Sequence, residues 1–393
     1  MKNKSLLIIL LLVEFSTKTL FGGSLSGKFG IGERQTAVSA RSLGMGGVNI
    51  VLNDAYNYSR WNPAQWIFVR PVRINFLSNT NYNQVENGVN GSFTEFGGFS
   101  MGFPLGPEFV VAGGVYPLSS SNYALVQSGV TNDVPWNLRV DGSGGISTFG
   151  LGVAYLVKDN LSIGIKNDWI FGNKIQEWNT VFEGTGFREG NFTKLTSFNG
   201  SIFTLSSFVQ QDKFMYALSL SLPIGFAIKR DIDSQFTDDI IGPEIDINYP
   251  VELRLGLSYS FWDRYRYALE YQRSDWSSFD TNFDGQYGVA YDILSGIERN
   301  SITTRVPFYS RIALRGGASF RKLYVKTFDN GDIFETSFSF GLGIPIHNGK
   351  ENFDLGVAFV FRDTGNTTLP KEKGIIFSIG YSASEAWFVR KGR

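Results

Sequence analysis

The chain has 393 residues, and its 36 Lys and Arg balance 36 Asp and Glu, so its formal net charge is zero. A neutral chain without a basic cluster is not expected to bind nucleic acid. The chain contains no cysteine, which excludes disulfides, thiolate metal sites and a lipid-bearing N-terminal cysteine. Aromatic residues make up 15% of it, yet no stretch approaches the ~18 apolar residues of a membrane helix. This composition leaves a large soluble β-protein or a membrane β-barrel.

The first 23 residues have the pattern of a secretory signal peptide. Residues 1–4 contain two lysines, residues 6–13 are all apolar, and small residues follow at 22–24. The apolar run is too short to anchor the chain in a bilayer. We therefore predict that residues 1–23 are a signal peptide and that the chain is exported. A buried N-terminal strand or helix is the alternative.

Residues 24–65 are rich in glycine and have no clear helical or strand period. If the following strands close into a barrel, this segment starts in the periplasm and can fold back into the lumen as a hatch. Glycines allow tight backbone packing, and an Asn-Pro pair suits the turn into the first strand. A disordered periplasmic tail is the alternative. The expected hatch motif consists of Arg41, Gly44, Gly46, Gly47, Asp54, Asn62 and Pro63.

From residue 66 onward, large apolar residues alternate with small or polar ones, which is the period of β-strands. The pattern is clearest in 251–261, 334–346 and 352–362. A large apolar face suits lipid, and a face of Gly, Ser and Ala with occasional charges suits a crowded lumen. We predict that Leu253, Leu255, Leu257, Phe338, Phe340, Leu355 and Val357 face lipid and that Glu252, Arg254, Asp354 and Arg362 face the lumen or rim.

The connections between the expected strands alternate between short and long. Outer-membrane barrels have this arrangement, with short periplasmic turns and long outer loops. The strands are expected at 66–78, 92–103, 109–118, 147–157, 160–172, 198–210, 214–226, 247–261, 264–276, 308–321, 322–328, 333–346, 352–362 and 374–388. The alternation requires the short strand at 322–328. The sequence therefore predicts an all-β fold, a 14-stranded antiparallel transmembrane β-barrel over residues 66–388, with a basic tail at 389–393 and both termini in the periplasm.

Five charged residues are expected on the inner face of the barrel. They are Glu252, Arg254, Glu270, Arg311 and Arg315. They would form ion pairs in the lumen, and Arg311 with Arg315 are the first candidates for holding a ligand carboxylate. The single histidine, His347, falls in an expected short turn. Neither a catalytic triad nor a histidine metal site is supported, so we expect no enzyme activity, no metal and no cofactor.

Several stretches resemble the FadL/TodX family of outer-membrane transporters for hydrophobic compounds. The stretch SARSLGMGGVNIVLNDAYNYSRWNPAQ (residues 39–65) resembles the N-terminal hatch of that family. The stretches YRYALEYQRSDWSSFD (265–280), SRIALRGGASF (310–320), FETSFSFGLGIPI (334–346) and NFDLGVAFVF (352–361) resemble its later strands. The ending EAWFVRKGR departs from the aromatic terminal residue that is typical of barrels, although Trp387 and Phe388 can take that role.

The resemblance implies passive uptake of hydrophobic or amphiphilic molecules in the outer membrane of a Gram-negative-type bacterium. It also implies a lateral exit in the third strand, where Gly113, Gly114 and Pro117 are the candidates, unless these residues reflect ordinary barrel packing. The implied partners are membrane lipid, a hydrophobic small molecule and the barrel-assembly machinery, with the chain as a monomer. The alternative is a barrel that does not transport and serves as a scaffold or docking component in secretion or surface attachment, as in PorV-like relatives.

Overall fold

The computed structural model describes residues 24–85, 90–131, 133–183, 189–235, 237–279, 285–302, 307–327, 330–363 and 371–385. The predicted signal peptide, the basic tail and the aromatic pair Trp387-Phe388 lie outside the described residues. Within the described ranges, no helix has the length and apolarity to cross a membrane.

The described strands close into the predicted 14-stranded antiparallel barrel. Its last strand pairs with its first, from Glu372↔Val85 to Glu385↔Val72. This pairing joins the two ends of the sheet, so neither the first nor the last strand is left as a free edge, which hydrocarbon would not tolerate. The wall strands are β2 (Val72–Val85), β3 (Gly91–Pro104), β4 (Phe109–Ser120), β6 (Val134–Lys158), β7 (Leu161–Phe182), β8 (Gly190–Gln211), β9 (Phe214–Ser234), β11 (Glu252–Phe261), β12 (Tyr265–Asp275), β14 (Val289–Arg299), β15 (Ala313–Lys326), β16 (Asp332–Ile346), β17 (Glu351–Asp363) and β18 (Glu372–Glu385).

Side chains alternate between the two faces of the wall as the sequence predicts. Leu255 is 44% exposed and Phe340 is 59% exposed on the outer face, whereas Glu252 and Arg254 are almost fully buried on the inner face. Asp354 and Arg362 are also buried. Because successive strand residues point to opposite faces, the period of two places apolar side chains toward lipid and polar ones toward the lumen.

Two of the expected strand assignments are wrong. Residues 322–328 do not form a strand of their own, because β15 runs without a break through Lys326. The missing strand is β14, which lies inside the stretch that was expected to be the long loop 277–307. Its inward Leu294 is apolar and buried, so the alternation is weaker there. The predicted number of strands is nevertheless confirmed, because one missed strand replaces one that does not exist.

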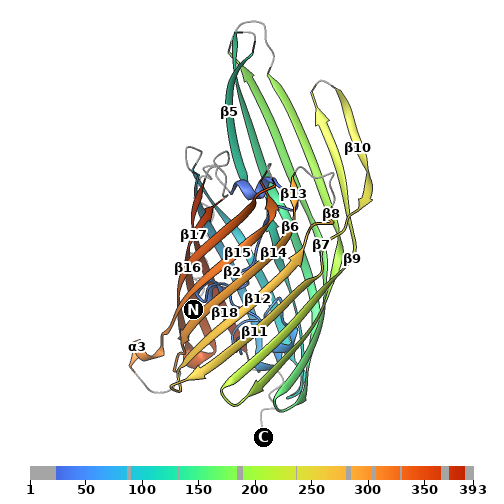
Figure 1. Cartoon of the computed structure of the whole chain (residues 1–393). Helices are drawn as coiled ribbons and strands as arrows, with labels where there is room; N and C mark the ends of the chain where they lie inside the picture. The colour runs from blue at the N-terminus through green and yellow to red at the C-terminus, as the bar shows by residue number, and fades with distance from the viewer. Residues whose placement is uncertain are drawn as a thin grey trace, which may run out of the picture.

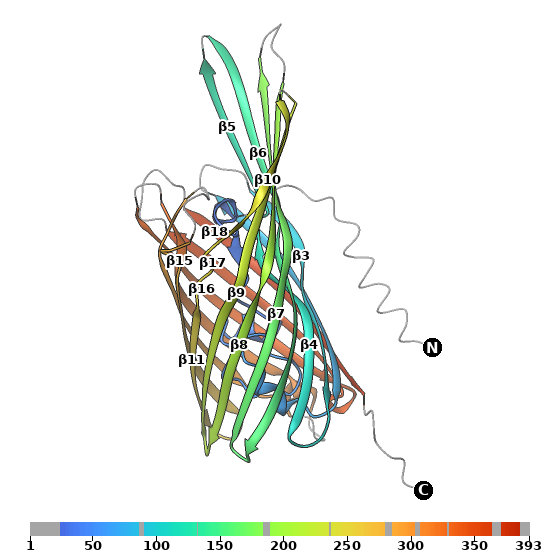
Figure 2. The same cartoon turned by 90° about the vertical axis from the view of Figure 1, so that its right-hand side faces the viewer.

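The expected long loops at 119–146, 173–197 and 227–246 are mostly strand instead. The wall strands β6 to β9 continue past the barrel rim, and β5 (Tyr123–Thr131) and β10 (Thr237–Asp246) pair with β6 and β9 beyond it. We call this extension, from β5 to β10, the outer sheet. It stands above one side of the barrel mouth (Figures 1 and 2). The short turns lie at the opposite end, together with the short helix α3 (Phe308–Arg311).

The N-terminal segment, residues 24–71, lies inside the barrel. It contains the 3-10 helices η1 (Leu25–Lys28) and η2 (Pro63–Phe68), the short strand β1 (Glu33–Arg34) and the helix α2 (Ala40–Gly44). The first wall strand therefore begins at Val72 and not at residue 66, because Asn62 caps η2.

The segment crosses the lumen from the outer end to the short-turn end. Ser24 bonds Glu372 and Arg362 at the outer ends of β18 and β17, whereas Ala64 bonds Ser206 and Ser162 near the inner ends of β8 and β7. The prediction that the segment starts in the periplasm is thus wrong for its first described residue. The described end of β18 does lie at the short-turn end, as expected.

Candidate functional site

The candidate site is the lumen together with the N-terminal segment that occupies it. The helix α2 touches β15, β16, β17 and β18, and glycines allow this close approach. A Cβ on Gly44 would lie 2.7 Å from the Cα of Gly341, and a Cβ on Gly317 would lie 2.1 Å from the amide nitrogen of Gly46. Gly46 and Gly47 also have positive φ angles, of 70° and 91°, which glycine adopts without strain. Three of the predicted motif glycines therefore bring the segment against the wall.

Arg41 joins the segment to the wall through a buried charge network. Its guanidinium lies 3.0 Å from Asp54 in the same segment and 2.6 Å from Glu298 on β14. Glu298 also pairs with Arg315, which reaches Asp354 on β17 at 2.5 Å. Burial alone would raise the pKa of the Asp54 carboxyl, but Arg41 and bonds from neighbouring donors lower it below its ordinary value. The structure thus brings the predicted residues Arg41, Asp54 and Arg315 into one network.

Asn62 and Pro63 form the turn at the inner end of the segment. The Asn62 side chain accepts a hydrogen bond from the amide of Ala64 and donates one to the carbonyl of Ile50. Pro63 occupies the first position of η2, where a missing N–H costs no helical bond. The predicted turn is therefore present, but it leads into a 3-10 helix before the first strand begins.

The other predicted lumen charges have different surroundings. Glu252 pairs with Arg254 at 2.6 Å and with Arg34 of β1 at 2.5 Å. Glu270 accepts hydrogen bonds from two backbone amides of the N-terminal segment. Arg311 lies in α3, before β15 begins at Ala313, so it does not join Arg315 in the lumen. Sequence reasoning misplaced Arg311 because it started this strand five residues too early.

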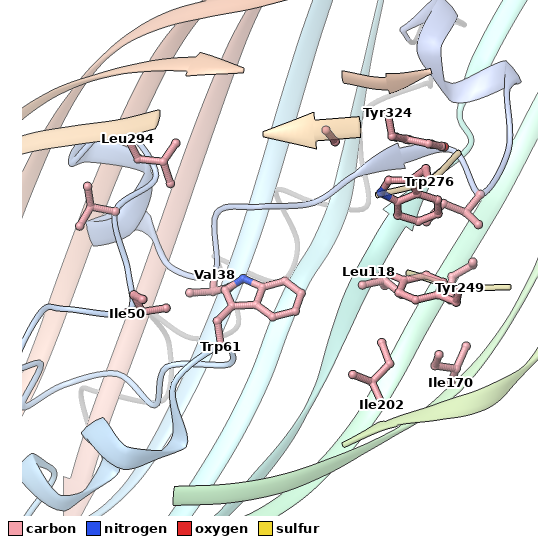
Figure 3. Packing of buried hydrophobic residues seen from close by; sticks show 14 of the residues in the cluster. Val38, Ile50, Trp61, Leu118, Ile170, Ile202, Tyr249, Trp276, Leu294 and Tyr324 are labelled. Carbon is pink, nitrogen blue, oxygen red and sulfur yellow. The ribbon is translucent and has the colours of Figure 1, made fainter. Parts of the chain in front are cut away.

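Apolar and aromatic side chains pack between the N-terminal segment and the wall. Figure 3 shows Trp61 of the N-terminal segment beside Val38, and Leu118, Tyr249, Trp276 and Tyr324 gathered near them. The Trp276 ring lies 5.0 Å from Tyr249 and 4.5 Å from Tyr324. Such packing forms a continuous apolar cluster between the segment and the wall.

The wall is interrupted between β3 and β4. These strands pair from Pro104↔Val110 to Phe99↔Val115, and beyond Phe99 the described part of β3 pairs with β2 alone. Nearer the outer end, β4 pairs with β1 instead of β3, and Glu33 lies opposite Ser120. The side chain of Gln35 bridges the interruption by donating to Glu95 of β3 at 2.9 Å. The N-terminal segment thus replaces part of the second wall strand.

The predicted exit residues lie next to this interruption. Gly113 and Gly114 belong to the last paired part of β4, opposite Met101 and Ser100, and Pro117 lies where the register of β4 on β6 shifts. The bend in the neighbouring strand was missed. β3 has a register shift on β2 beside Gly98, whose φ is +149°. The pair Gly97-Gly98 is the sequence signal that could have indicated it.

A cavity of about 40 Å³ lies beside β1, toward the outer end of the lumen. Such a volume holds a few water molecules. Charged side chains dominate its lining, which includes Glu33, Arg34, Asp292, Arg321, Glu335 and Arg362. It suits water or a small polar group better than a hydrocarbon. Among the described residues, no cluster of three acidic or histidine residues is close enough to hold a metal ion.

The chain is similar in fold to solved structures of channels and transporters. The CymD monoaromatic hydrocarbon channel aligns with a TM-score of 0.61 at 17% identity, over 90% of this chain and 99% of that chain. A Pseudomonas aeruginosa FadL homologue aligns with a TM-score of 0.61 at 13% identity, over 90% and 99%. The Ralstonia pickettii toluene transporter TbuX aligns with a TM-score of 0.61 at 14% identity, over 89% and 98%. A search of curated proteins finds no match.

The closed barrel and its fold similarity define the class: an outer-membrane β-barrel with the FadL-type channel fold, of the kind found in Gram-negative bacteria. The similarity extends over nearly the whole of the compared channels. Within this class, the chain belongs to the BamG family, whose model matches residues 1–392.

Proposed function

We propose that this protein admits hydrophobic or amphiphilic small molecules from outside the cell and releases them sideways into the membrane. Long-chain fatty acids and aromatic hydrocarbons are the proposed classes. The N-terminal segment acts as the hatch, and the lateral exit is the interruption between β3 and β4. The compared structures carry hydrocarbon-channel and toluene-transporter names, which supports this choice over a secretion scaffold.

The observation that carries the proposal is the replacement of β3 by β1 beside β4. A strand of two residues, held by few backbone bonds, is easier to displace than a full wall strand. A solute that leaves through a water-filled mouth must expose its apolar surface, at a cost of ~25 cal/mol per Å². A side exit into lipid avoids that exposure.

The test is to tether the segment across the interruption. The chain has no cysteine, so Gln35→Cys with Glu95→Cys gives one possible disulfide between side chains that now hydrogen-bond. Uptake of a long-chain fatty acid and of toluene is measured in proteoliposomes. Uptake by the oxidised variant should be at least tenfold lower than that of the unmodified protein, because the segment can no longer move away from β3.

The reduced form of the same variant is the control, and it should transport like the unmodified protein. Equal uptake by the oxidised and reduced forms would rule out this exit. No uptake of either solute by the unmodified protein would reject the transport function itself.

A second candidate function follows from the family name. BamG suggests a component that works with the barrel-assembly machinery, and the family match extends over almost the whole chain. A lumen filled by the N-terminal segment is compatible with such a role because it needs no passage through the barrel. Depletion of the chain in cells should then reduce the folded amounts of unrelated outer-membrane barrels within one or two generations. Normal amounts of those barrels, together with lost solute uptake, would reject this candidate and support transport.

A further inference from the structure

The outer sheet ends in two edge strands that differ in how they are protected. The edge strand β10 carries Asp239, Pro243, Glu244 and Asp246, and its register on β9 shifts twice. Charges, proline and irregular register are the features that keep natural edge strands from pairing with other chains. The edge formed by β10 is therefore protected against pairing with another chain, and we call it the guarded edge.

The edge strand β5 has none of these protections. Its sequence, YALVQSGVT, contains no charged residue and no proline. It pairs with β6 without a shift from Tyr123↔Gly142 to Thr131↔Val134. Val126 is 55% exposed and Val130 is 67% exposed. A regular, uncharged, exposed edge is a template for an added strand.

The register shows which backbone groups of β5 face outward from the sheet. The amide of Ser121 donates to the carbonyl of Gly144, and the same register continues along β6 to Thr131↔Val134. Hydrogen-bonded and non-hydrogen-bonded pairs alternate in an antiparallel ladder, so the odd residues of β5 bond β6. Within the described strand, the amides and carbonyls of the even residues point to the free edge; these are Ala124, Val126, Ser128 and Val130.

The chain itself already adds a strand to the sheet edge directly below β5. Just below β5, β1 pairs antiparallel with the outer end of β4, and both β4 and β5 pair with β6. The helix η1 then turns the N-terminal segment aside at the base of β5. The rest of β5 rises past this point, away from the barrel (Figure 2).

We propose that the free edge of β5 binds an uncharged, extended segment of another protein at the cell surface, as an added antiparallel strand. Because β5 runs away from the barrel, the added strand runs toward the membrane. Successive side chains of the added strand lie alternately on the two faces of the outer sheet. One face carries Val126 and Val130, and the other carries Leu125 and Trp136. Apolar and β-branched residues fit both faces. This interaction is independent of the transport proposal.

Membrane orientation argues against a second copy of this chain as the occupant. Two copies in one membrane both have β5 running outward, so their β5 strands cannot pair antiparallel. The β10 strand of a second copy runs in the required direction, but it carries the acidic residues and the proline of the guarded edge. The occupant is therefore a strand of a different protein.

The test places a photo-crosslinking amino acid at 126, 128 or 130 in the full-length protein, in intact cells. The matched control is position Ile241 on β10, which is 74% exposed. We expect a cross-link to one other surface protein from β5 and none from Ile241. Moving the probe outward by two residues should move the cross-linked position by two residues in the opposite direction along the partner, as antiparallel pairing requires.

A second variant tests the backbone contact itself. With the probe at 130, Ser128→Pro removes a free-edge amide but no β5–β6 hydrogen bond, and it should weaken the cross-link at least tenfold, whereas Ser128→Ala should not. Heat-modifiable gel mobility confirms that each variant folds. Absence of any cross-link from the β5 positions, a cross-link to a second copy, equal cross-links from Ile241 or insensitivity to proline would each overturn the proposal.

Discussion

At the residue scale, glycines and paired charges decide how the N-terminal segment sits in the lumen. Gly44, Gly46 and Gly317 allow backbone-to-backbone contact, and Arg41 links Asp54 to Glu298. Charges buried in this way depend on their partners, because removing one partner leaves an uncompensated charge. The sequence motif identified Arg41, Gly44, Gly46 and Asp54. It could not identify Gly317 or Glu298, since their role depends on which strand lies opposite.

Two neighbouring glycines of β15 provide a matched test of this contact. A Cβ at Gly317 would lie 2.1 Å from the Gly46 amide nitrogen, whereas a Cβ at Gly316 would have its nearest neighbours 4.0 Å away. Gly317→Ala should lower the free energy of unfolding by about 1–3 kcal/mol through overpacking. Gly316→Ala should change it by less than about 0.5 kcal/mol. Urea unfolding in detergent measures both, and equal effects would refute the close contact.

The lipid-facing residues allow a second prediction. Leu255 is exposed on the outer face of β11, at a depth expected within the hydrocarbon. Leu255→Arg should destabilise the folded barrel in lipid vesicles by roughly 2–4 kcal/mol, because a charge near the midplane loses its hydration. Ile241→Arg on the outer sheet is the control and should have little effect. A loss no larger than that of the control would contradict the assignment of Leu255 to lipid.

At the scale of elements, the strands are longer than their membrane spans. The strands β6 to β9 have between 21 and 25 residues, whereas about 9–11 are enough to cross a bilayer at a tilt. The outer parts are paired only with each other, so they belong to the outer sheet and not to the barrel.

This division predicts that the β5–β6 hairpin is dispensable for folding of the barrel. Replacing residues 123–142 by a four-residue glycine-rich turn removes β5 and the part of β6 that pairs with it. All fourteen wall strands keep their pairing inside the membrane. The variant should insert and show heat-modifiable mobility like the unmodified chain. Failure to insert would show that the hairpin is part of the folding unit.

At the scale of the whole molecule, the described part of the N-terminal segment runs through the lumen from the outer end to the short-turn end. The barrel must therefore close around the segment, or the segment must pass through the lumen before its contacts form. Ser24 near the outer rim and Ala64 near the inner ends of the strands fix this direction.

Cysteine labelling tests this direction, since the chain has no cysteine of its own. Lys28 lies in η1 at the base of the outer sheet, and His347 lies in a short turn at the opposite end. The His347 side chain is 56% exposed. Each residue is replaced by cysteine in a separate variant. A large membrane-impermeant maleimide should label Lys28→Cys on intact cells and His347→Cys only after the outer membrane is permeabilised. The reverse pattern would invert the proposed topology.

The sequence alone determined the fold class and the direction of the strand side chains, and it gave the right number of strands although one strand was placed wrongly. These properties follow from the period of two, which is local, and from the alternation of short and long connections. The tertiary structure decided the rest. It identified β14 as a wall strand although Leu294 weakens its pattern, it converted expected loops into the outer sheet, and it set the path of the N-terminal segment. It also placed β1 in the interruption beside β4. Each of these depends on pairing between residues distant in sequence, and a local pattern cannot specify which distant strand supplies the partner.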